Sequence, residues 1–197
     1  NIPGNGISNG TNYSTTAAMQ SNTSGGAYNN LLITGNTINV LNAQSASPEV
    51  ILGYWENGHD HTGNITVSNN QFLSLAPGNN PALNLQRAFR VTSHSGPTST
   101  VTYSGNTAKG ANIGFQWLAG QDFIGKLPVQ FSANNVDGNY TGLHVQSNGS
   151  LNAVNNFIKN GNDGILINGA STVVALNNDL SSNTNKAINN SGTIAAT

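Results

Sequence analysis

The chain lacks cysteine altogether, and charged residues make up only 7% of it. Without cysteine, a disulfide framework and a thiolate metal site are both excluded. Six Lys and Arg residues in 197 positions, with a net charge of −1, leave no basic patch for nucleic acid. No apolar run has the length of a transmembrane helix. These shortages exclude disulfide-rich proteins, nucleic-acid-binding proteins and proteins with membrane-spanning helices.

Asparagine is what the chain has in excess, with 35 copies. Asn and Gly tolerate left-handed backbone conformations, and Ser, Thr and Asn side chains bond to nearby backbone, so these residues favour turns. Hydrophobic residues still make up 36% of the chain and its net charge is low, which argues against disorder. Short apolar runs alternate with Asn- and Gly-rich segments, and no segment has a helical period. The pattern therefore indicates an all-β chain with many turns.

A six-residue repeat recurs along the chain and carries asparagine at its fourth position each time. The clearest copies are 153–158 and 175–180, and successive copies are spaced by 34, 36, 28, 22 and 22 residues. An apolar residue stands two positions after each asparagine. The repeat asparagines are Asn36, Asn70, Asn106, Asn134, Asn156 and Asn178. Such self-similarity is typical of a solenoid, in which the shortest spacing is one coil and the longer ones contain inserted loops.

Apolar residues alternate on both sides of the repeat asparagines. Segments 114–117, 142–145 and 164–167 each begin eight residues after an asparagine and predict a further strand in the coil. Alternation along a strand directs every second side chain inward, so each coil has an apolar inner face that only stacked neighbours can bury. An asparagine at a repeated turn can hydrogen-bond to the asparagine of the next coil, which satisfies a buried amide.

We therefore predict an all-β fold, a right-handed parallel β-helix (a solenoid) of about six to seven coils with an internal asparagine ladder. Residues 1–197 are expected to form one segment. In it, 1–30 form a partial first coil and a loop, 31–190 form the six ladder repeats, and 191–197 form a terminal tail or cap. Asn5-Gly6-Ile7 resembles the start of the second strand, so residue 1 is expected to begin in mid-coil within a longer chain.

On this repeat, residues 31–190 resemble the parallel β-helix superfamily that includes pectate lyases, alginate epimerases and lyases, polygalacturonases and phage tailspikes. The resemblance implies the fold and little about the chemistry, because one scaffold hosts many activities. Lyases of this kind use Arg or Lys as a base, with a basic group or calcium at the uronate carboxylate. Calcium is therefore the one cofactor that the resemblance allows, and none is assured.

Titratable residues gather between Glu49 and His94, a window that holds five of the 13 charged residues and three of the four His. Loops on a rigid scaffold commonly carry function, so this window supplies most of the candidates. The candidate catalytic residues are Arg90, His94, His61 and Glu56. The candidate substrate-binding residues are Tyr54, Trp55, His59, Asp60, Arg87, Gln116 and His144.

In an extended segment, His59 and His61 would point to one side and could bind a metal with Glu56. A solvated polar loop accounts for the same residues, and we predict no metal site. The segment Gly58-His59-Asp60-His61 lacks the Tyr-Gly and the Pro of the alginate epimerase site, so the catalytic roles of that family are not carried over.

Segment 88–91 aligns with 114–117, which predicts that Arg90, Gln116 and His144 form an outward column on consecutive coils. Such a column could follow a sugar chain, and Arg suits the carboxylates of an acidic polysaccharide. A merely solvated surface column is the alternative. We expect the inserted loops near 49–61 and 76–87 to form the walls of a groove over this column.

The first functional hypothesis is a carbohydrate-contacting module of a secreted or cell-surface protein, with polysaccharide as its partner. Low charge with many neutral polar residues resembles secreted bacterial and phage surface proteins. The second is a polysaccharide lyase or C5-epimerase acting on acidic polysaccharide; hydrolysis is less favoured, since Asp137, Asp163 and Asp179 do not share one repeat position. The third is a structural or adhesive spacer, with self-association through the solenoid ends.

Overall fold

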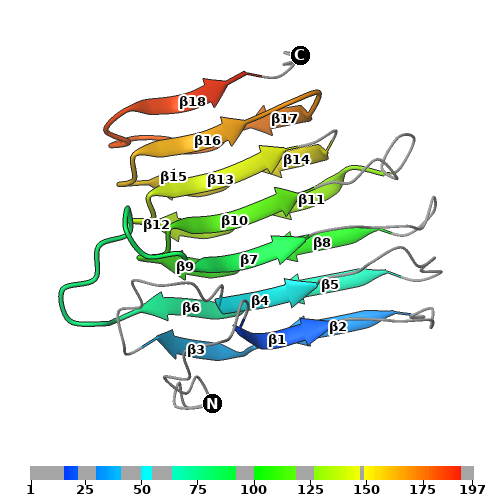
Figure 1. The fold of residues 1–197 in the computed structure, drawn as a ribbon. Helices are drawn as coiled ribbons and strands as arrows, with labels where there is room; N and C mark the ends of the chain where they lie inside the picture. Colours follow the sequence, from blue (N-terminus) through cyan, green and yellow to red (C-terminus); the bar gives the residue numbers. More distant parts are fainter. Residues whose placement is uncertain are drawn as a thin grey trace.

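The computed structural model describes residues 16–21, 30–40, 50–54, 64–91, 100–118, 127–146 and 149–191. In these ranges all regular secondary structure is β-strand, and no helix occurs. Every strand pair described is parallel, and the strands of successive repeats lie one above another (Figure 1). Parallel strands need a long connection, and here each connection passes through the strands of the other sheets. The arrangement is consistent with the predicted parallel β-helix.

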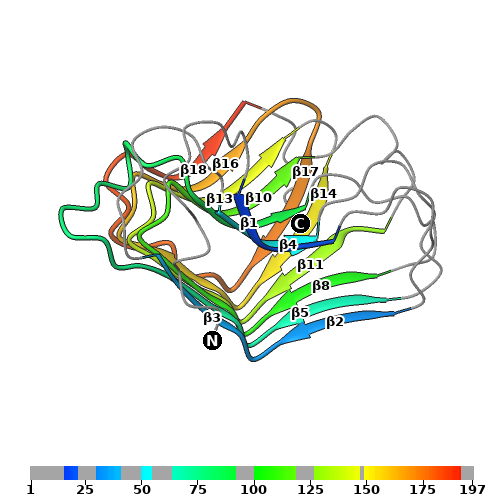
Figure 2. The same cartoon turned by 60° about the horizontal axis from the view of Figure 1, so that its bottom comes forward.

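Three sheets surround a common interior, as the tilted view shows (Figure 2). The first sheet contains β2 (Leu31–Thr34), β5 (Ile65–Ser68), β8 (Val101–Ser104), β11 (Val129–Ser132), β14 (Ser150–Val154) and β17 (Thr172–Leu176). The second contains β3 (Thr37–Val40), β6 (Gln71–Ser74), β9 (Thr107–Lys109), β12 (Asn135–Asp137) and β15 (Phe157–Lys159). The third contains β7 (Arg87–Val91), β10 (Ile113–Leu118), β13 (Thr141–Gln146), β16 (Asp163–Ile167) and β18 (Lys186–Asn190).

The register of these sheets confirms the predicted inward columns. In the first sheet, Ile33 pairs with Val67 and Val67 with Tyr103, and the same column continues through Phe131 to Ala153. All five side chains are buried. Each coil thus covers the apolar residues of its neighbours, which is the burial that a single coil cannot achieve alone.

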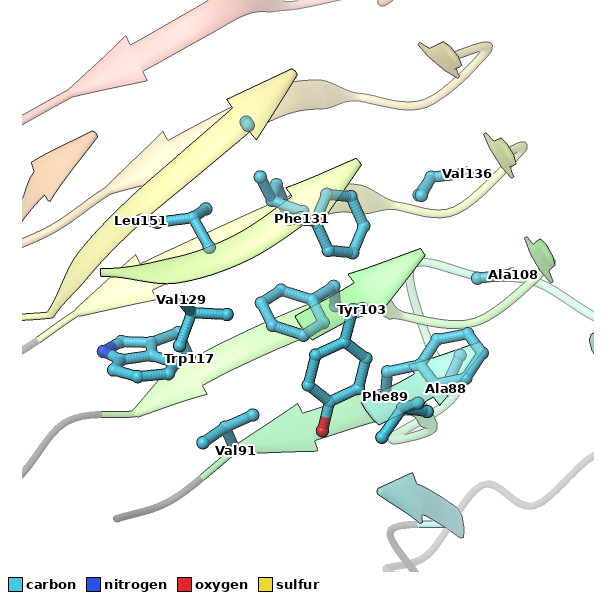
Figure 3. Packing of buried hydrophobic residues seen from close by; sticks show 14 of the residues in the cluster. Ala88, Phe89, Val91, Tyr103, Ala108, Trp117, Val129, Phe131, Val136 and Leu151 are labelled. Atoms are coloured by element: carbon cyan, nitrogen blue, oxygen red, sulfur yellow. The ribbon is translucent and has the colours of Figure 1, made fainter. Parts of the chain in front are cut away.

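Aromatic side chains from the first and third sheets meet in the middle of the interior (Figure 3). Tyr103 lies between Phe89, at 6.1 Å between ring centroids, and Phe115, at 4.8 Å, with both pairs edge to face. Phe115 also contacts Phe131 at 4.6 Å. Edge-to-face contacts suit the ring quadrupoles, so the two sheets are joined by interactions that depend on ring orientation as well as on area.

The six repeat asparagines, which we call the asparagine column, lie at the corner between the first and second sheets. The side chain of each is hydrogen-bonded to the next, at Nδ2–Oδ1 distances of 2.8–3.1 Å. The bonds of Asn134 show the pattern. Its Oδ1 accepts from the backbone N and from Nδ2 of Asn106, and its own Nδ2 donates to Asn156 Oδ1 and to Tyr103 O. The buried amide therefore finds partners in both neighbouring coils.

The residue before each column asparagine has a left-handed backbone, with φ between +53° and +70°. It is Asn or Gly in five coils: Gly35, Asn69, Gly105, Asn155 and Asn177. These two residue types tolerate the left-handed region, which explains the frequent Asn-Asn pairs of the repeat. Ala133 is the exception, at φ 53°.

Two stretches that the sequence assigns to loops contain strands. β1 (Thr16–Ser21) lies within 1–30, where a partial first coil and a loop are expected, and β4 (Val50–Tyr54) lies within the loop expected near 49–61. The two pair with each other in parallel, and β4 lies beside β7 of the third sheet (Figure 1). Neither strand has the asparagine frame from which the repeat was recognised, so the sequence alone could not place it.

We predict that Asn134→Leu destabilises the fold by about 1–3 kcal/mol, because donors of Asn106 and the carbonyl of Tyr103 lose their buried partner. Urea unfolding monitored by circular dichroism measures the change. Asn135→Leu is the matched control, since Asn135 is the next residue and is exposed. Equal stability of the two variants would contradict a structural role for the column.

We also predict that Ala133→Asn stabilises the fold by about 1 kcal/mol, since a left-handed conformation is unfavourable for Ala and tolerated by Asn. The midpoint of thermal unfolding should rise accordingly. Ser132→Asn, one residue earlier in strand β11, serves as the control and should bring no gain. A lower midpoint for Ala133→Asn would show that strain at this turn is relieved in another way.

Candidate functional site

The predicted polar column exists as a line of residues on the third sheet. Arg90 pairs with Gln116, Gln116 pairs with His144, and His144 pairs with Leu166. These residues alternate with Phe89, Phe115, Leu143 and Ile165, all of which are buried in the interior. The alternation places the polar column on the side of the sheet that faces away from the interior.

The column is nevertheless far less open than the sequence suggests. Arg90 is only 9% exposed and Gln116 only 4%, whereas His144 is partly exposed. At these first two positions, burial argues against both an open groove floor and the alternative of a merely solvated surface column. A side chain that points away from the interior of the solenoid can still be covered by connecting segments. The alternation of residues along a strand does not indicate whether such a segment is present.

Polar contacts run along this face from coil to coil. Gln116 Nε2 donates to Gln146 Oε1 at 3.2 Å, and Asn168 Nδ2 lies 3.1 Å from His144 Nε2. Ser191 Oγ lies 3.0 Å from Asn168 Oδ1, so the polar contacts continue from His144 through Asn168 to Ser191. We call Gln116, His144, Gln146 and Asn168 the amide–imidazole row.

The sequence did not single out Gln146 and Asn168. Gln146 lies two residues after His144 in the same strand, where continued alternation would have indicated it. Asn168 follows directly after β16, beyond the predicted strand, and no repeat position marks it. In both cases the contact across coils, rather than the pattern along one strand, identifies the residue.

Positive groups gather at the end of the row. Burial lowers the pKa of Arg87 to about 10, and the positive charge of Arg90 adds to this. Burial also lowers the pKa of Arg90. The pKa of His144 is lowered by burial and then by the charge of Arg87. The three side chains thus share one electrostatic environment, in which Arg87 and His144 are partly exposed.

Most of the other candidates lie outside the described residues: Trp55, Glu56, His59, Asp60, His61 and His94. Tyr54 ends strand β4, and only its backbone is described. The proposed roles of all these residues stay predictions. In the described ranges, no three His, Cys, Asp or Glu side chains come together as a metal site. Calcium therefore remains an expectation from the resemblance.

The segment 76–87, expected as a wall of the groove, lies at the corner between the second and third sheets (Figure 1). Its bonds go to the turn before β10: Asn79 Nδ2 and Asn84 Nδ2 both donate to Gly110 O, and Asn112 Nδ2 donates to Pro81 O. The segment is therefore held at the start of β10, whereas Gln116 lies in the second half of that strand.

We predict that acidification destabilises the protein in part through His144. Its folded pKa is lowered, so as pH falls below the ordinary value of 6.5 the unfolded state takes up a proton before the folded state does, and stability is lost. His144→Gln keeps a hydrogen-bonding side chain without the charge, and its unfolding free energy should fall less between about pH 7.5 and about pH 5.5. Identical pH profiles for the two proteins would contradict this assignment.

The described part of the chain contains no helix long and apolar enough to cross a membrane. The chain matches no protein-family model, no curated protein and no solved structure.

Proposed function

We propose that this chain is a structural segment of a secreted or cell-surface protein. In this proposal it is a right-handed parallel β-helix of about six to seven coils, held by an internal asparagine ladder, that acts as a rigid spacer or adhesive stalk. The observation that carries the proposal is the burial of Arg90 and Gln116, the first two members of the column expected to bind a ligand. Burial of these two side chains supports a structural role for the face that was predicted to bind a ligand.

The hydrogen-bond pattern supports a scaffold role. Each interior member of the asparagine column bonds to the coil on either side, and the amide–imidazole row bonds across coils on the opposite face. The six strands of the first sheet, at about 4.8 Å per step, extend for about 24 Å. The length of a solenoid increases in proportion to its number of coils, which is what a spacer requires.

Carbohydrate contact is the second candidate, and the partly exposed Arg87 favours it. Arg87 lies in the electrostatic field of Arg90 and His144, and Gln146 adds a partly exposed amide on the same sheet. A guanidinium beside neutral amides suits the carboxylate and hydroxyl groups of an acidic polysaccharide. Lyase or C5-epimerase activity has less support, because the candidate catalytic residue Arg90 is buried.

A titration with uronate-containing oligosaccharides distinguishes the two proposals. For a spacer, calorimetry should detect no binding, and no unsaturated product should form. If carbohydrate binds, Arg87→Ala should weaken binding by about 1.5–3 kcal/mol, the range for a hydrogen bond to a charged group, and added salt should weaken it further.

The matched control is Lys109→Ala, which removes an exposed basic group from β9 in the second sheet. Binding that is lost in Arg87→Ala and kept in Lys109→Ala would replace the spacer proposal by the carbohydrate one. Equal losses would indicate nonspecific attraction by charge and leave the spacer proposal standing.

A further inference from the structure

Two Asn-Gly pairs lie wholly within the described residues, at different corners of the coil. Asn160-Gly161 lies between β15 and β16, and Asn168-Gly169 lies between β16 and β17 (Figure 1). An asparagine before glycine loses its side-chain amide readily, because glycine has no side chain to hinder attack by its backbone nitrogen on that amide. The same dipeptide thus occurs in two surroundings, which determine whether each copy can react.

The first pair is held by hydrogen bonds at both reacting groups. Gly161 N, the atom that would attack, donates to Asn183 Oδ1 at 3.1 Å. The side-chain nitrogen of Asn160 donates to Asp137 Oδ1 at 2.6 Å. Attack by Gly161 N on the Asn160 amide would break the first bond and place negative charge near the Asp137 carboxylate. We therefore expect Asn160 to be protected, although its side chain is exposed.

The second pair is open at the attacking atom. Within the described part of the chain, no residue accepts a hydrogen bond from Gly169 N, and Gly169 and Ala170 are both exposed. Residues 168–171 belong to no strand. Ser191 of the following coil already lies over Asn168, so the surroundings of this amide are formed by coils on both sides. The attacking nitrogen can therefore reach the amide without giving up a bond.

His144 and Ser191 contact the two ends of the Asn168 amide. His144 Nε2 lies 3.1 Å from Nδ2, and Ser191 Oγ lies 3.0 Å from Oδ1. A hydroxyl at the amide oxygen stabilises the negative charge that forms there when a nucleophile adds to the carbon. An imidazole exchanges protons near neutral pH, so it can supply the proton with which the nitrogen leaves. The two contacts therefore match the two atoms at which charge develops.

We propose that Asn168 is a self-modification site, at which the folded chain converts an asparagine into aspartate and isoaspartate. Gly169 N adds to Cγ of Asn168 and loses its proton to water. The Cγ–Nδ2 bond then breaks, and ammonia leaves with a proton from His144, which regains one from solvent. Water opens the resulting cyclic succinimide at either carbonyl. The net reaction converts an amide and one water molecule into a carboxylate and ammonium.

The modification changes the last member of the amide–imidazole row. A carboxylate replaces the neutral amide beside His144, on the face that also carries Arg87 and Arg90. The isoaspartate form also adds a carbon to the backbone next to Asn168 N, which donates to Val145 O at 2.8 Å. The inference rests on this corner alone and is independent of whether the chain acts as a spacer or contacts carbohydrate.

Peptide mapping of the full chain after incubation at neutral pH tests the proposal. Trypsin cleaves after Lys159 and Lys186, so one peptide carries both pairs, and its fragmentation locates each conversion. We expect Asn168 to convert about tenfold faster than Asn160, because attack at Asn160 must first break the bond from Gly161 N. Side-chain exposure alone predicts the opposite order, since Asn160 is exposed and Asn168 only partly so.

Two comparisons separate the effect of the fold from that of the dipeptide. In the chain unfolded by urea, both sites should convert at similar rates, because the same pair then reacts without its surroundings. His144→Gln removes the imidazole and should slow conversion of Asn168 by about tenfold or more, with Asn160 unchanged. The control is Gln116→Asn, on the same face, since Gln116 bonds to Gln146 instead. His144→Asn replaces His144→Gln if the first variant loses its β-sheet circular dichroism spectrum.

The proposal is overturned if Asn168 converts no faster than Asn160 in the folded chain. It is also overturned if the difference persists after unfolding, which would assign it to the flanking residues instead of the fold. An unchanged rate in His144→Gln would exclude proton delivery by the imidazole, and with it the proposal that the folded chain promotes its own conversion.

Discussion

In the asparagine column, Oδ1 of each member after the first accepts two hydrogen bonds from the asparagine of the preceding coil, one from its backbone N and one from its side chain. The rest of the structure depends on this contact. It fixes the height of each coil on the next, because both donors must reach one oxygen atom. Once that corner is fixed, the strands on either side stack in register, and the apolar columns of the first and second sheets follow.

This constraint also explains why the coils tolerate such different lengths. Successive column asparagines are 34, 36, 28, 22 and 22 residues apart, yet the bonds between them have nearly the same length. In the 36-residue interval, part of the extra length is the segment 75–86, which leaves the coil after β6 and returns to it at β7. Such insertions are tolerated because loop closure becomes only slowly more costly with length. The left-handed residue before each asparagine turns the chain at that corner, which selects Gly or Asn there.

The third sheet aligns Arg90, Gln116 and His144 on one face. The hydrogen bonds and pKa values of these residues depend instead on how deeply each side chain is buried. Burial lowers the pKa of each of the two arginines and of the histidine, and places Gln116 and His144 in bonds to Gln146 and Asn168. Polar side chains that bond across coils in this way stabilise a scaffold, and Arg87 and His144 are the partly exposed basic groups of this sheet.

The sequence by itself determined the parallel stack, the register of the inward columns and the line from Arg90 to His144. All of these follow from a period of two along each strand and from the asparagine that repeats in every coil. The tertiary structure alone decided that Arg90 and Gln116 are buried and that 16–21 and 50–54 add strands. Burial depends on segments distant in the sequence, and no local pattern records which segment covers a face.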